Sequence, residues 1–191
     1  MRTYRAPSLN ALLFLIALNV VIFIITLARP GDIYLLFGLS PASFLHQPWT
    51  IVTSMFVHGG IGHILANMIS LFFLGRFVIQ LVGENKFLIV YFVGGIVGNI
   101  LFLLLAPTFA IGIGASGAIF ALGGALIMMA PGLRVFIIPI PIPIPLWVAM
   151  LIFLLLSFVV SVISWEAHLG GILAGLGAGY YFKKKRTYFY R

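Results

Sequence analysis

The residue with the clearest chemical potential is Ser116, which follows a glycine-rich segment and begins an apolar run that ends before Pro131-Gly132. If residues 116–130 form a helix at ~1.5 Å per residue, it spans about 22 Å. The hydrocarbon core of a membrane is about 30 Å thick, so in a membrane Ser116 would lie below the surface. Free N–H groups at a helix N-terminus favour negative charge. This position can stabilise an oxyanion and indicates a serine nucleophile.

Three further polar side chains lie inside apolar runs. His63 and Asn67 are four residues apart, which places them on one face of an expected helix, and His168 lies one turn into the last run. Polar residues within membrane spans are costly and by default mark a functional site. His168 can be the general base for Ser116, and His63 and Asn67 can donate to an oxyanion. Glu166 is expected to point away from His168, so the pattern indicates a Ser-His dyad.

Each of these residues also has a structural interpretation. A lone membrane serine often bonds to its own helix, and a lone histidine or asparagine often joins two helices. Four such residues at a similar shallow depth, with glycines before the serine, favour catalysis instead.

A metal site is not favoured by the histidine spacing. His58 and His63 are five residues apart, and no HExxH motif or carboxylate cluster accompanies them. His58 precedes Gly59-Gly60 and is interpreted as a buried structural histidine near the site. We expect neither a metal nor another cofactor.

The composition excludes a soluble globular protein. The chain is 63% hydrophobic and only 7% charged, with a mean hydropathy of +1.23, whereas soluble domains carry about 25% charged residues. The net charge of +8 lies mostly in the tail Lys183-Lys184-Lys185-Arg186 and at helix ends. There such residues set topology and contact anionic lipid, so nucleic-acid binding is not expected. The absence of cysteine excludes a thiol nucleophile.

The hydropathy pattern predicts an all-α, polytopic membrane protein of one domain (1–191) with six transmembrane helices. The predicted spans are residues 9–27, 61–81, 87–105, 116–130, 146–163 and 166–182. The long apolar connection 28–60 indicates an interfacial loop or short re-entrant helices. The alternating Pro and Ile of residues 139–145 predict an extended, non-helical segment, to which we assign no function.

Small residues at every fourth position predict which two spans pack most closely. The sixth span carries Ala167, Gly171, Gly175 and Gly179, and the fourth carries Gly117, Ala121 and Ala125. Such ridges let two helices approach closely.

The distribution of basic residues predicts the orientation. Six spans place both termini on one side, and Arg29 is the single Lys or Arg expected on the other. The residues expected on the side of the termini are Arg2, Arg5, Arg76, Lys86, Arg134, Lys183, Lys184, Lys185, Arg186 and Arg191. By the positive-inside rule both termini are cytoplasmic. We therefore expect a multi-pass cell-membrane protein in which Ser116 opens toward the outside.

At these positions the sequence resembles the rhomboid family of intramembrane serine proteases. The resemblance covers nearly the whole chain and follows the order of the spans. It consists of Gly114-Ala115-Ser116-Gly117, of His58-Gly59-Gly60 with His63 and Asn67, and of Ala167-His168-Leu169-Gly170-Gly171.

The resemblance implies a six-helix rhomboid-like bundle with Ser116 as nucleophile and His168 as base. It also implies an oxyanion hole formed by His63, Asn67 and the Ser116 N–H, and it makes residues 28–60 the family's membrane-embedded first loop. Phe120 stands where relatives place an aromatic ring near the base. One departure is Trp49-Thr50, where many members have Trp-Arg.

The predicted function is therefore intramembrane endopeptidase activity near the extracellular side of the membrane. Expected substrates are single-span membrane proteins whose outer helix end unwinds easily. The main alternative is a catalytically inactive rhomboid-like protein that binds or escorts clients, but that alternative predicts loss of Ser116 or His168. A transporter would favour internal repeats, and no convincing repeat relates the two halves.

Overall fold

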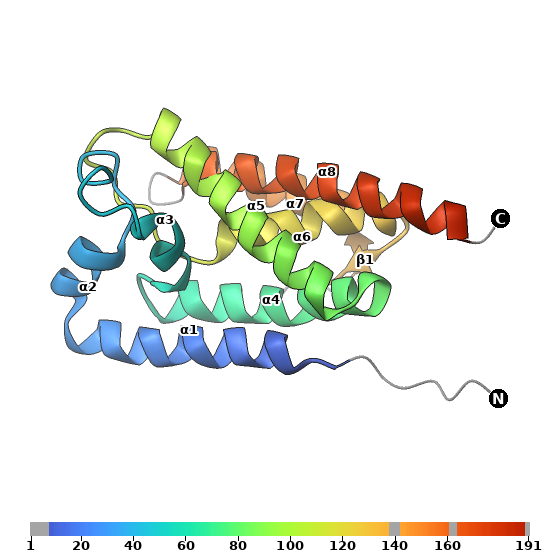
Figure 1. Cartoon of the computed structure of the whole chain (residues 1–191), viewed down its shortest axis with the longest axis horizontal. Coiled ribbons are helices and arrows are strands. Elements are labelled where there is room, and N and C mark those ends of the chain that lie inside the picture. Colours follow the sequence, from blue (N-terminus) through green and yellow to red (C-terminus); the bar gives the residue numbers. More distant parts are fainter. Residues whose placement is uncertain (1–7, 138–141, 161–163, 190–191) are drawn as a thin grey trace.

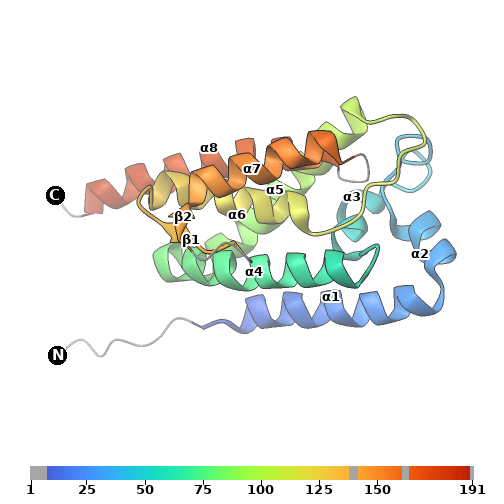
Figure 2. The ribbon, with the colours of Figure 1, turned by 180° about the vertical axis from the view of Figure 1, so that it is seen from behind.

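The computed structural model describes residues 8–137, 142–160 and 164–189, which form a bundle of helices (Figure 1). The elements are α1 (Asn10–Ala28), α2 (Pro30–Phe37), α3 (Thr50–Thr53), the 3-10 turn η1 (Ser54–Phe56), α4 (Ile61–Val82), α5 (Glu84–Leu105), α6 (Ser116–Met129), β1 (Arg134–Val135), β2 (Ile144–Pro145), α7 (Leu146–Val159) and α8 (Trp165–Phe189). Both chain ends point to the same end of the bundle, and α2 and α3 lie at the other (Figures 1 and 2).

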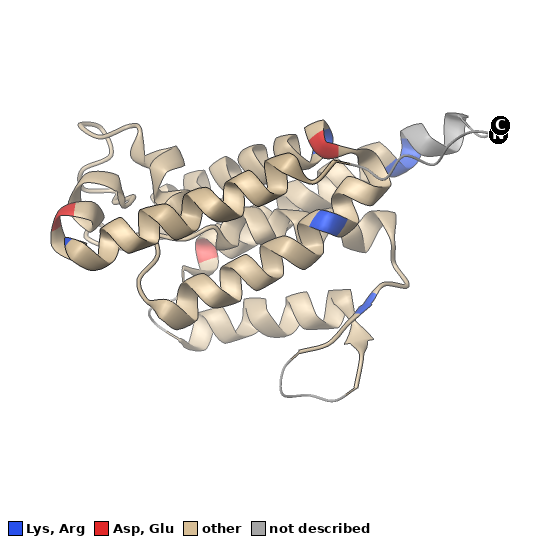
Figure 3. Ribbon diagram, turned by 90° about the horizontal axis from the view of Figure 1, so that it is seen from below, with Lys and Arg blue, Asp and Glu red and all other residues tan. Residues whose placement is uncertain are grey.

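The helices have the character of membrane helices. Three of them, α1, α4 and α5, are long and apolar enough to cross a membrane, with mean hydropathies of 2.9, 1.8 and 2.5, while α6 and α7 are shorter apolar helices. Large apolar side chains such as Phe14, Ile24 and Leu104 are exposed on the outer faces. Figure 3 shows few charged segments, with Lys and Arg gathered toward the end that holds the termini. The predicted all-α membrane bundle is confirmed.

Three helix ends differ from the predicted spans. α5 begins three residues earlier than predicted. Gly83, with φ +87°, ends α4, and the polar residues from Glu84 onward form the first turn of α5. α8 continues beyond residue 182 to Phe189, since no helix breaker stops it. α7 ends at Val159 instead of reaching 163, and residues 161–163 lie outside the described part.

The Pro-Ile segment forms part of a small hairpin. Strands β1 and β2 pair antiparallel, with Val135 opposite Ile144 and Arg134 opposite Pro145. The prediction of a non-helical segment is confirmed for residues 142–145. Residues 138–141 lie outside the described part, so the prediction is not tested for residues 139–141.

The centre of the bundle is α6, whose residues 117–126 are all buried. It packs most closely on α8, because glycines let the two backbones nearly touch. A Cβ atom added to α8 at Gly171, Gly175 or Gly179 would lie 2.0, 2.0 or 2.5 Å from the carbonyl oxygens of Gly117, Ala121 and Ala125, respectively. The predicted pairing of the two small-residue ridges is therefore confirmed, and it fixes the register between Ser116 and His168.

Candidate active site

Ser116 is the first residue of α6, at an end of the helix that no side chain caps. The N–H groups of a first helical turn have no carbonyl partner within the helix. The Ser116 N–H therefore remains available as a donor, and the helix dipole favours negative charge beside it.

His168 on α8 reaches Ser116 directly. Its Nε2 lies 2.8 Å from Ser116 Oγ, which is hydrogen-bonding distance. The imidazole is buried and stacks on the ring of Phe120, with centroids 4.1 Å apart and planes inclined by 13°. Because Phe120 comes one turn after Ser116 on α6, the same helix supplies the hydroxyl and supports the ring that faces it.

The second ring nitrogen of His168 is not held by an acid. Within the described residues, Nδ1 is buried and has no hydrogen-bond partner, and the buried Glu166 side chain forms no ion pair with His168. In a neutral imidazole one nitrogen donates and the other accepts. If Nδ1 carries the proton, Nε2 is free to accept a hydrogen bond from the Ser116 hydroxyl. Within the described residues, the pair of Ser116 and His168 therefore has no third, acidic member.

His63, on α4, places an N–H donor near the Ser116 hydroxyl. The Gly59 N–H donates to His63 Nδ1 over 3.3 Å, so the neutral ring carries its own proton on Nε2. A Cβ atom added at Gly114 would lie 2.7 Å from His63 Nε2 and 3.8 Å from Ser116 Oγ. His63 Nε2–H and the serine hydroxyl thus flank Gly114. That residue has φ +117°, a conformation that favours glycine.

Asn67 lies one turn further along α4, on the same face as His63. Its Nδ2 donates to the His63 carbonyl over 2.9 Å, and its buried Oδ1 has no partner in the described part of the chain. An amide group carries two N–H donors, so the bond to His63 leaves one for a ligand.

His58 lies in the turn before α4 and has a structural environment. It is fully buried, its Nδ1 lies 3.2 Å from the Phe56 carbonyl oxygen, and its ring meets the edge of His63 at a centroid distance of 5.1 Å. Burial, with the charge of His63 as a second cause, lowers the pKa of His58 to about 4. His58 therefore stays neutral near pH 7. No group of three or more potential metal ligands occurs among the described residues.

The loop before Ser116 is held in place by the first connection, residues 28–60. Leu39 and Gly112 exchange two main-chain hydrogen bonds of 2.9 and 2.7 Å, and the Gly114 N–H donates to the Ser54 carbonyl over 2.8 Å. The connection therefore fixes the backbone from which α6 begins.

Sequence reasoning missed Asn99, which braces this connection from α5. Its Nδ2 donates to the Ile51 carbonyl over 2.7 Å and to Ser54 Oγ over 3.0 Å. Asn99 thus acts on the site through Ser54 and Gly114 without touching the dyad. The signal was present in the sequence, because Asn99 is a polar residue within an apolar span.

Comparisons with known proteins show what this chain is similar to. The rhomboid domain family model matches residues 45–185. The putative rhomboid protease YdcA of Bacillus subtilis is 32% identical over 142 residues, which cover 73% of this chain and 71% of YdcA. The rhomboid protease GluP of the same organism is 32% identical over 170 residues, 85% of this chain but 33% of GluP. Rhomboid-like protease 3 of Toxoplasma gondii is 33% identical over 152 residues, 76% of this chain and 56% of that protein.

Proposed function

This chain belongs to the rhomboid family, and we propose that it is a serine endopeptidase that cleaves other membrane proteins at peptide bonds within the membrane. The observation that carries the proposal is the 2.8 Å contact between Ser116 Oγ and His168 Nε2. It occurs beside an uncapped helix N-terminus in a chain made almost entirely of apolar helices. The proposed six spans correspond to α1, α4, α5, α6, α7 and α8.

In the proposed reaction, Ser116 Oγ attacks the carbonyl carbon of the scissile bond while His168 Nε2 takes the hydroxyl proton. Negative charge then develops on the carbonyl oxygen, where the Ser116 N–H, His63 Nε2–H and Asn67 Nδ2–H can donate hydrogen bonds. Protonated His168 gives its proton to the leaving amine as the C–N bond breaks. Water, activated by the same imidazole, then hydrolyses the acyl-enzyme and restores Ser116.

In the proposed dyad an aromatic ring, and not an acidic side chain, holds the orientation of the histidine. In a Ser-His-Asp triad the carboxylate orients the imidazole. Here the Phe120 ring, parallel to within 13° and 4.1 Å away, limits tilting of His168, and burial limits its motion further. This supports His168 as a base without an acidic partner.

The expected substrates are single-span proteins that unwind locally. A helix hides its carbonyls in its own hydrogen bonds, so attack by Ser116 requires an extended segment. Unpairing backbone groups in lipid costs several kcal/mol each, which favours substrates whose outer helix end contains Gly or Pro. We propose that both termini are cytoplasmic and that cleavage occurs near the outer face, since the basic residues gather at the end of the termini.

The test of the dyad is cleavage of a membrane-embedded reporter by the purified chain. Ser116→Ala and His168→Ala should abolish cleavage and leave the unfolding midpoint close to that of the wild type. Ser157→Ala and His46→Ala are the matched controls, because Ser157 only donates to the Leu154 carbonyl on α7 and His46 is exposed on the first connection. Cleavage by folded Ser116→Ala at the wild-type rate would sink the assignment.

The same reporter tests the proposed substrate class. Replacing Gly and Pro at its outer helix end by Leu and Ala, with insertion into the membrane checked, should slow cleavage. If the stiffened reporter is cut equally fast at the same bond, unwinding does not select substrates. The intact Ser116–His168 contact argues against the inactive, client-binding alternative, and uncleaved but tightly bound reporter would support it.

A further inference from the structure

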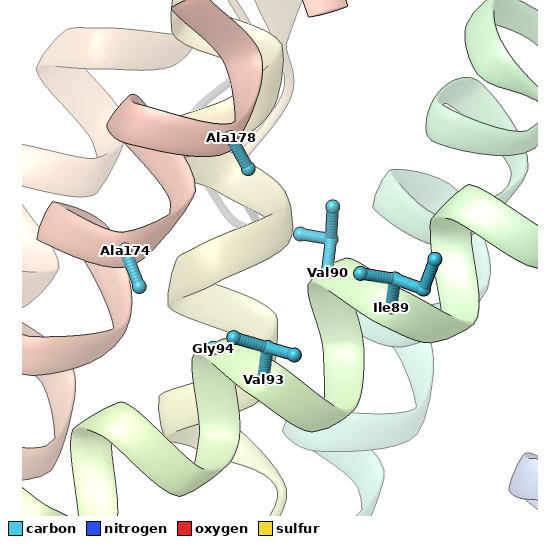
Figure 4. A pocket seen from close by; sticks show the side chains of 6 residues that line it. All are labelled: Ile89, Val90, Val93, Gly94, Ala174 and Ala178. Atoms are coloured by element: carbon cyan, nitrogen blue, oxygen red, sulfur yellow. The ribbon is translucent and has the colours of Figure 1, made fainter. Parts of the chain in front are cut away.

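A small apolar cavity lies between α5 and α8 (Figure 4), and neither Ser116 nor His168 lines it. Its volume is about 50 Å³. We call it the α5–α8 notch; it is lined by Ile89, Val90, Val93, Gly94, Ala174 and Ala178. The side chains from the two helices point toward the space between them (Figure 4). Ile89 and Val93 are more than half exposed, so the notch faces the surroundings of the bundle.

The size and lining of the notch select a hydrocarbon chain. Pockets for drug-sized molecules have volumes of about 300–1,000 Å³ and include placed polar groups, and the notch has neither feature. A second transmembrane helix is about 10–12 Å wide with its side chains and cannot enter a cavity of about 50 Å³. A few methylene groups of an acyl chain can enter it, while the rest of the chain lies along the two helices.

A cation lies one helical turn beyond the residues that line the notch. Lys86 lies one turn before Ile89 and Val90 on α5, and Phe182 lies one turn after Ala178 on α8, so both share the face of the notch. The Lys86 Nζ atom lies 5.4 Å from the centroid of the Phe182 ring, a cation–π contact that bridges the two helices. Lys183 and Lys184 follow directly.

The charge of Lys86 is not neutralised by a carboxylate in the described part of the chain. The ion pair found there is Arg29–Asp32, and the nearby Glu84 carboxylate accepts the Ala11 N–H at the start of α1. Lys86 is exposed at the end of the bundle where the termini lie. A positive group one helical turn beyond the apolar notch fits an anionic headgroup joined to an acyl chain.

We propose that the α5–α8 notch binds one acyl chain of an anionic phospholipid whose phosphate contacts Lys86. The chain lies against Val90 and Gly94, with Ala174 and Ala178 on the opposite wall, and the glycerol backbone passes the Phe182 ring. Lys183 and Lys184 add positive potential near the headgroup. The bound lipid bridges α5 and α8, the two helices that pack on α6 at the dyad. The proposal is independent of proteolysis.

The test is lipid retention by the purified full chain in detergent, measured by native mass spectrometry. The probes are phosphatidylglycerol and phosphatidylcholine with identical acyl chains, titrated separately and in competition. The wild type should retain phosphatidylglycerol preferentially. Lys86→Gln should weaken its retention about fivefold, which corresponds to roughly 1 kcal/mol for one basic residue near a membrane surface. Ala178→Leu, which fills the notch, should weaken retention of both lipids.

Matched controls separate the site from general effects. Arg134→Gln removes one exposed charge at the same end of the bundle, and Gly177→Leu places a leucine on α8 at a position where an added Cβ meets nothing within 4 Å. Both should bind lipid as the wild type does. Equal retention of the two lipids by the wild type, or equal losses in Lys86→Gln and Arg134→Gln, would overturn the proposal. A change of oligomeric state in Ala178→Leu without loss of lipid would also overturn it, in favour of an interface between copies.

Discussion

Substitution of Gly171 by alanine tests whether the approach of α6 to α8 sets the dyad distance. The added Cβ would lie 2.0 Å from the Gly117 carbonyl oxygen and 2.9 Å from its carbonyl carbon, whereas ordinary contacts begin at 3.4 Å. Both obstructing atoms belong to the main chain, so no side-chain rotation relieves the clash. The two helices must separate locally by about 1.4 Å to restore an ordinary contact.

This separation acts directly on the dyad. Ser116 is adjacent to Gly117, and His168 lies one turn before Gly171, so the 2.8 Å contact between Oγ and Nε2 should lengthen to about 4 Å, beyond hydrogen-bonding distance. Misplacement of a catalytic group by about 1 Å can cost a factor of about 10² in rate. Overpacking typically costs about 1–3 kcal/mol of stability. Gly171→Ala should therefore be folded, less stable and at least about 100-fold slower.

The assay is the initial rate of reporter cleavage per folded enzyme, with thermal unfolding measured in parallel. Gly177→Ala is the matched control on the same helix, because an added Cβ there meets nothing within 4 Å and alanine favours the helix. The control should retain the wild-type rate and stability. If Gly171→Ala cleaves within about twofold of the wild-type rate, the expected loss from misplaced catalytic groups is absent. That result would refute the inference that the close packing of α6 on α8 positions the dyad.

Three further predictions concern the oxyanion site and the effects of pH on activity and on stability. Asn67→Ala should lower kcat by about 10²–10³, the loss found on removing one oxyanion donor, and an unchanged kcat would restrict Asn67 to its bond with the His63 carbonyl. Acidification should lower activity, because His168 must be neutral to accept the serine proton; a rate that stays unchanged at every acidic pH at which the chain is still folded would contradict a histidine base. His58 adds an effect on stability, because burial lowers its pKa from 6.5 to about 4. Between these two pH values the unfolded state binds a proton on His58 that the folded state excludes. Stability should fall as pH falls, by up to about 3 kcal/mol, and unfolding measured at each pH separates this loss from the loss of catalysis.

The sequence by itself determined the membrane class, the approximate helices and the candidate dyad. Hydropathy is a local property, so the apolar runs marked α1, α4, α5, α6 and α7 to within a few residues at most ends. Polar residues are costly inside such runs, which is why Ser116, His63, Asn67 and His168 stood out without any structure. The repeat of small residues at every fourth position also predicted which faces of α6 and α8 meet.

Only the tertiary structure decided the distances and orientations of these polar side chains relative to one another. The 2.8 Å approach of His168 to Ser116 depends on two backbones in contact at Gly171 and Gly117, and helical periodicity does not specify that distance. The proton position on His63 follows from the Gly59 N–H bond to its Nδ1. The brace from Asn99 through Ser54 to Gly114 joins three segments distant in the chain, and the α5–α8 notch exists only between two packed helices. Local sequence determines which residues share a helix face, but contacts between faces are set by side-chain volumes across the interface, and those volumes act only once the bundle has packed.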